Sequence, residues 1–104
     1  MNYEVCVLRK DEFEKFVAKL DNESKARLAR DIDFLKQNGL SLRMPLAKKI
    51  HNKLWELRIS GKQRVRIIYS IKESQIYILN WFIKKTQKTP IKELKKSIKR
   101  LTEI

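Results

Sequence analysis

The chain has 104 residues, enough for one small domain with a single core, and we expect residues 1–104 to form that one domain. Hydrophobic residues make up 42% of it, which excludes a disordered protein. No apolar run approaches the roughly 18 residues of a membrane span, and the first residues lack the apolar stretch of a signal peptide. We therefore expect a cytoplasmic protein without a membrane partner.

The net charge of +13 is distributed unevenly. Residues 1–39 carry eight basic and eight acidic side chains, whereas residues 40–104 carry seventeen basic and four acidic ones. The whole excess therefore lies in the second part of the chain. Such segregation favours a polyanionic partner, either a nucleic acid or an acidic protein. A basic surface without a partner is the alternative.

Residues 3–9 alternate between apolar and polar side chains and predict a first strand, on which we expect Cys6 to be a buried thiol. A helix should follow, because apolar residues recur with helical spacing between residues 13 and 20, and Asp11 with Glu14 resembles a capping box. A second helix is predicted over about residues 23–38. It would be capped at Asp21–Asn22 and ended by Gly39.

Residues 40–53 are predicted to form a connection with a basic run around His51, the only histidine. A lone histidine is able to act as a general acid or base, but an exposed loop residue is the simpler interpretation. Residues 54–60 and 64–71 each alternate with one apolar face, which is typical of half-buried antiparallel strands. Residues 76–83 are apolar on both faces and predict a central strand that is covered on both sides.

The last predicted element is a helix that starts at Thr89, as N-cap, and Pro90. One face of it is apolar and the rest is basic. The predicted order is therefore β-α-α-β-β-β-α, an α+β fold. An N-terminal strand and a helical hairpin precede an antiparallel three-strand meander and the C-terminal helix, around a mostly antiparallel four-stranded sheet.

Arginines gather on the polar side of the predicted meander. Arg64 and Arg66 are two residues apart on one strand and project to the same face, and Arg58 on the paired strand can lie across from them. Such a group of guanidiniums suits phosphate oxygens and would stabilise a pentavalent phosphoryl transition state. A lysine crowded by these cations, Lys84 or Lys85, would have a lowered pKa and would be suited to proton transfer. From the residues alone, catalysis and plain binding of an anion are equally compatible with this face.

Other chemistries lack the residues that they need. With one histidine and one cysteine there is no constellation of metal ligands and no internal disulfide. With two glycines there is no Gly-rich phosphate loop, and no Ser-His-Asp arrangement is supported. We therefore expect no metal and no cofactor.

The segments LWELRI, RVRIIY and WFIKKTQKTPIKEL, in this order, resemble the HigB branch of the RelE/ParE toxin superfamily, including its phage-derived members. The order of elements agrees over essentially the whole chain, and residues 82–94 are the most specific part. The resemblance implies a toxin of a type II toxin–antitoxin system that cleaves messenger RNA in the ribosomal A site. It implies a metal-independent endoribonuclease whose nucleophile is the ribose 2′-OH. The implied partners are a cognate helix-turn-helix antitoxin and the ribosome with its mRNA.

The resemblance also assigns residues to the site. Arg66 would hold the scissile phosphate and, as a residue of a sheet face, should contribute little to the core. Arg58 would lie beside it, with Lys84 and Lys85 as the basic pair before the last helix. Tyr69 matches a family tyrosine, but alternation places it on the apolar face and favours a structural role. Further basic residues are expected to bind RNA: Lys48, Lys49, Lys53, Lys62, Arg64 and Lys88.

The chain departs from relatives that place histidines near the site, because none occurs after His51. The same scaffold also serves ParE-like proteins, which inhibit DNA gyrase by binding and cut no RNA. A non-catalytic RNA-binding module is a third interpretation. The cluster of arginines and lysines beside the strands favours the nuclease.

Overall fold

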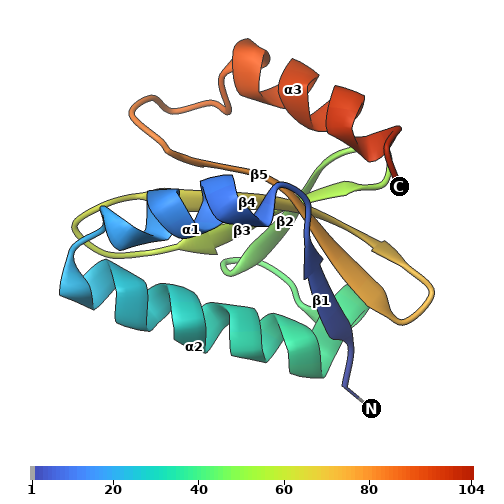
Figure 1. The fold of residues 1–104 in the computed structure, drawn as a ribbon, viewed down its shortest axis with the longest axis horizontal. Coiled ribbons are helices and arrows are strands. Elements are labelled where there is room, and N and C mark those ends of the chain that lie inside the picture. The colour runs from blue at the N-terminus through green and yellow to red at the C-terminus, as the bar shows by residue number, and fades with distance from the viewer. Residues whose placement is uncertain (1) are drawn as a thin grey trace.

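The computed structural model describes residues 2–104. It contains a five-stranded sheet with the strand order β1-β5-β4-β3-β2, in which β1 is parallel to β5 and the other neighbours are antiparallel (Figure 1). The predicted α+β class is confirmed. The elements are β1 (Glu4–Val7), α1 (Lys10–Ala18), α2 (Asn22–Asn38), η1 (Gly39–Ser41, a short 3₁₀ turn), β2 (Ala47–His51), β3 (Leu54–Ile59), β4 (Val65–Lys72), β5 (Gln75–Ile83) and α3 (Ile91–Leu101).

Helices cover both faces of the sheet. In Figure 1, α1 and α2 lie on one face and α3 lies on the other. Strand β5 lies between β1 and β4, so the prediction of an interior strand covered on both sides is confirmed. Within residues 2–104, no helix is long and apolar enough to cross a bilayer. A cluster of buried side chains fills the space on each face of the sheet. The cluster under α1 and α2 includes Leu28, Leu35, Leu57, Ile67 and Tyr69. The cluster under α3 consists of Leu54, Ile68, Leu79 and Phe82.

One strand was not predicted. Ala47–His51 forms β2, an edge strand that pairs antiparallel with β3, within the stretch that we expected to be a connection. Two consecutive lysines interrupt the alternation in this short segment, as is common in edge strands. The sheet therefore has five strands instead of four. His51 is exposed, as expected, but it ends a strand and does not lie in a loop.

The N-terminal elements differ from the prediction in two details. Asp11 and Glu14 form no capping box, because α1 begins before them and follows Arg9, which has a left-handed conformation and makes no side-chain cap. Cys6 is exposed instead of buried, since β1 is an edge strand of the sheet. Asp21 does cap α2, as predicted, by accepting a hydrogen bond from the amide of Ser24 at 2.7 Å.

Gly39 ends α2, as predicted, with a φ of +50°. The ring of Tyr3 occupies the space that a Cβ atom on Gly39 would fill. Gly39→Ala should therefore combine backbone strain with a steric clash and lower the free energy of unfolding by about 2 kcal/mol, which urea denaturation would measure. In a Tyr3→Ala background the clash is absent, so the cost of Gly39→Ala should be smaller. Equal costs in the two backgrounds would contradict this account.

Candidate functional site

A groove with a strongly basic lining lies on the α3 side of the sheet, and we call it the basic groove. It has a volume of about 390 Å³ and is bordered by β2, β3, α3 and residues 84–90, the joining segment between β5 and α3. Five of its ten lining residues are basic, and one is a carboxylate. The ten residues are Lys48, Lys49, Ile50, Glu56, Arg58, Lys84, Gln87, Lys88, Thr89 and Leu94.

The register of the strands brings two of the three predicted arginines together, since Arg64 lies just before β4. Arg58 on β3 is directly opposite Arg66 on β4, as predicted. Lys48 on β2 is opposite Glu56, so a cation and the carboxylate adjoin on the same part of the sheet. A smaller hollow of about 200 Å³ is lined by Arg58 and Arg66 together with Pro45 and Ser60. Because Arg58 lines both spaces, Arg66 lies at the border of the basic groove.

Arg66 is buried, with 7% of its surface exposed, and the expectation that it contributes little to the core is wrong. Its Nε lies 3.8 Å from Oε1 of Glu56, and its Nη1 donates a hydrogen bond to the carbonyl oxygen of Val65 at 3.0 Å. Burial lowers the pKa of Arg66, and Arg58 and Arg64 act in the same direction while Glu56 opposes them. A guanidinium nonetheless remains charged at any physiological pH.

Sequence reasoning missed Glu56 and Thr89 as residues of the site. Glu56 is 2% exposed, and its Oε2 accepts a hydrogen bond from the Thr89 hydroxyl at 2.8 Å. Thr89 was predicted to cap α3, but the helix begins after Pro90 without a side-chain cap. Alternation already placed Glu56 on the same face as Arg58, so a lone acid within a basic face was the available signal. No sequence pattern indicated the hydrogen bond of Thr89 to Glu56, because the two residues are 33 positions apart in the sequence.

The two lysines after β5 differ in position. The amide of Lys84 donates a hydrogen bond to the carbonyl oxygen of Arg64 at 2.8 Å, which continues the β4–β5 pairing by one step. Its side chain is half-buried and lines the basic groove. Lys85 is exposed and does not line the groove. The structure therefore separates the predicted basic pair and leaves Lys84 as its member at the site.

Lys84 has a lowered pKa, mainly because its ammonium is partly withdrawn from water. Glu56 opposes this effect, and the charges of Arg66, Arg58 and Lys48 add to it. A lowered pKa was expected from crowding by cations, but burial is the larger cause. A lowered pKa makes the neutral amine of Lys84 more accessible than that of an ordinary lysine, as a proton acceptor requires.

Half of the predicted RNA-binding residues lie at the basic groove. Lys48, Lys49 and Lys88 line it. The other three are exposed, do not line the groove, and lie in or next to the turns that flank β3: Lys53, Lys62 and Arg64.

Tyr69 belongs to the core under α1 and α2, on the opposite face of the sheet from the α3 cluster. It is 1% exposed and stacks on Trp55, with ring centroids 6.2 Å apart. Burial raises the pKa of its hydroxyl. These contacts support the structural role that alternation favoured.

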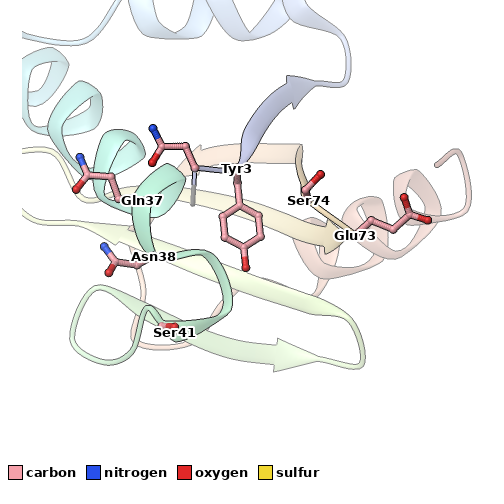
Figure 2. Close-up of a pocket in the computed structure, with 7 residues that line it drawn as sticks. Tyr3, Gln37, Asn38, Ser41, Glu73 and Ser74 are labelled. Atoms are coloured by element: carbon pink, nitrogen blue, oxygen red, sulfur yellow. The ribbon is translucent and has the colours of Figure 1, made fainter.

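A second pocket, of about 380 Å³, lies between the end of α2 and the β4–β5 turn (Figure 2). Tyr3, Asn38 and Glu73 contribute to its wall, and none of its seven lining residues is basic. It shares no residue with the basic groove. In residues 2–104, no three His, Cys, Asp or Glu side chains lie together as metal ligands would. The basic groove is therefore the place where the charges suit a phosphate.

Comparisons with known proteins show the family and the fold of the chain. Residues 15–102 match the family described as phage derived protein Gp49-like (DUF891). A comparison with curated proteins gives no match. Among solved structures, the chain is similar to an arginine-substituted mutant of the E. coli toxin RelE in the free state, with a TM-score of 0.68 and 11% identity over 97% of this chain and 99% of that chain. The chain therefore has a RelE-like fold and belongs to the phage derived Gp49-like family.

Proposed function

We propose that this protein is the toxin of a type II toxin–antitoxin system, related to the HigB branch, and that it cuts messenger RNA on translating ribosomes in the cytoplasm. The observation that supports the proposal most is the meeting of Arg58, Arg66 and Lys84 at one border of the basic groove. The family and the RelE-like fold agree with it. A cognate helix-turn-helix antitoxin, the ribosome and its mRNA are the partners that this proposal includes.

The chemistry would be an internal transfer of the phosphoryl group. The 2′-oxygen of a ribose bonds to the adjacent phosphorus and the bond from phosphorus to the 5′-oxygen breaks, which leaves a 2′,3′-cyclic phosphate and a 5′-hydroxyl. Arg66 and Arg58 stabilise the added charge on the phosphoryl oxygens. Lys84 in its neutral form accepts the 2′-proton and then, as an ammonium, donates it to the leaving 5′-oxygen. Lys48 and Lys88 bind neighbouring phosphates.

Mapping of RNA ends after brief expression of the protein in a bacterial host tests this proposal. We expect cuts in register with codons, confined to translated messages and carrying 5′-hydroxyl ends that become ligatable after phosphorylation. A matched transcript without a ribosome-binding site should remain whole. Cuts with 5′-phosphate ends, or no cuts at all, would contradict the proposal. Inhibition of DNA supercoiling by the purified protein, without cuts, would identify the gyrase inhibitor instead.

A further inference from the structure

The basic groove contains one feature that phosphate binding alone does not explain, the buried carboxylate of Glu56. We propose that Glu56 and Thr89 are positioning residues. Glu56 holds Arg66 on β4 and, through Thr89, also holds the joining segment that carries Lys84, so that both cations face one phosphate. The link to RNA cleavage rests on the function proposed above, whereas the positioning itself does not.

The two oxygens of Glu56 have different partners on different parts of the chain. Oε2 accepts the hydrogen bond from Thr89, and Oε1 lies 3.8 Å from Nε of Arg66. The second distance is that of an ion pair and is too long for a hydrogen bond. Accordingly, Nε of Arg66 is buried and has no hydrogen-bond partner within residues 2–104. Arg66 is thus held beside Glu56 by charge and not by a hydrogen bond.

The joining segment is fixed to the sheet at its two ends. At its start, the amide of Lys84 donates to the carbonyl oxygen of Arg64 at 2.8 Å. Near its end, the Thr89 hydroxyl donates to Glu56, and the next residue is Pro90, which has no amide hydrogen to offer. The residues between these points form no helix or strand. Loss of the Thr89 contact would therefore leave the segment anchored only through Lys84 at its start and α3 at its end, with the part around Lys88 less restrained.

A negative charge in a groove for phosphate weakens anion binding, so its presence calls for a compensating role. Glu56 faces four cations that would otherwise repel one another, namely Lys84, Arg66, Arg58 and Lys48. Among these groups, Glu56 is the one that raises the pKa of Lys84. Removal of its charge should therefore lower the pKa of Lys84 further.

Three variants test the proposal on programmed ribosomes. Thr89→Val removes the hydroxyl and should slow single-turnover cleavage by about 10- to 100-fold, because the joining segment loses its anchor. Thr89→Ser keeps the hydroxyl and should restore most of the rate. Glu56→Gln still accepts the Thr89 hydrogen bond but loses the charge that holds Arg66. Its plateau rate at high pH should therefore be lower, and its pH–rate profile should move to lower pH.

Matched controls separate positioning from general damage. Thr102→Val removes a similar hydroxyl, which donates to the carbonyl oxygen of Lys99 at 2.6 Å, and Glu103→Gln removes a carboxylate paired with Arg9 at 3.1 Å. Neither residue lines the basic groove. Both controls should cleave like wild type, and near-ultraviolet circular dichroism should show that all variants are folded.

Measurements that do not depend on cleavage separate the positioning roles of Glu56 and Thr89 from the proposed nuclease function. In the free protein, NMR titration of the Lys84 ammonium should show a lower pKa in Glu56→Gln than in wild type, and no change in Glu103→Gln. Amide hydrogen exchange in residues 84–90 should be faster in Thr89→Val than in Thr102→Val. Unchanged titration and exchange would overturn the positioning roles, even if wild type cleaves RNA. If both changes appear but wild type cleaves nothing, the positioning stands and the proposed nuclease function is wrong.

Discussion

Replacement of Arg66 with alanine should abolish cleavage and weaken the fold at the same time. The side chain is 7% exposed and is the ion-pair partner of Glu56, which is 2% exposed. Truncation of one member leaves the other as a buried charge without its partner, so the free energy of unfolding should fall by about 3 kcal/mol. Loss of a donor to the transition state should slow cleavage by about 1,000-fold. Urea denaturation and single-turnover cleavage would measure the two effects.

Two further variants separate stability from chemistry at this position. Arg66→Lys keeps a positive charge beside Glu56 and should retain most of the stability, but it loses the planar guanidinium and should remain about 100-fold slower in cleavage. Arg27→Ala removes a partly exposed arginine of α2 that pairs with Glu23 at 3.5 Å, and it should change stability by less than about 1 kcal/mol. An Arg66→Ala protein as stable as wild type would show that the buried ion pair does not support the fold.

Replacement of Lys84 should remove the dependence of cleavage on pH. The proposed base is the neutral amine, so the wild-type rate should rise with pH up to the lowered pKa of Lys84 and then level off. Lys84→Arg stays protonated throughout, so we expect a loss of about 100- to 10,000-fold with no such rise, while binding to ribosomes persists. A Lys84→Arg protein with the wild-type pH profile would assign the proton transfer to another group. Lys15→Arg on α1 is the matched control.

The same lysine should also make the stability of the fold depend on pH. Burial places the pKa of Lys84 in the folded protein below its ordinary value of 10.5, so the folded state binds fewer protons than the unfolded state between those two values. The free energy of unfolding should therefore rise with pH between those two pKa values. At neutral pH, the partly buried ammonium destabilises the folded state. Lys84→Met should accordingly be more stable than wild type at pH 7. At pH 11 this difference in the free energy of unfolding should be smaller. Urea denaturation at the two pH values would measure both differences.

Periodicity was sufficient for the parts of the fold where every second residue is apolar. Strands β3, β4 and β5 and the pairing of Arg58 with Arg66 follow directly from alternation and short turns. Strand β2 was not predicted, because its lysines face solvent at a sheet edge, where little apolar surface is needed. The capping residue of α2 was also predictable, since Asp21 bonds an amide three residues away. Local rules succeeded where the interaction itself is local.

Alternation assigns a residue to a face of the sheet, but it does not say what covers that face. Arg66 was placed correctly on the polar side, yet α3 lies over that face of the sheet and Arg66 is buried. Thr89 followed the usual pattern of a helix cap, but its hydroxyl bonds a carboxylate of a strand far away in the sequence. A buried charge and a distant hydrogen bond depend on tertiary packing, so neither was accessible from spacing alone.

The pairing of β1 with β5 has a consequence for how quickly the protein reaches its working form. Glu4 is paired with Gln75, and the basic groove takes residues from Lys48 to Leu94. Contacts between such distant parts of a chain slow folding relative to helical proteins of the same size. Synthesis delivers the N-terminal residues first, so the groove is incomplete until the residues up to Leu94 have been made. If the proposed function holds, that delay is an interval in which the antitoxin meets a chain that does not yet cleave RNA.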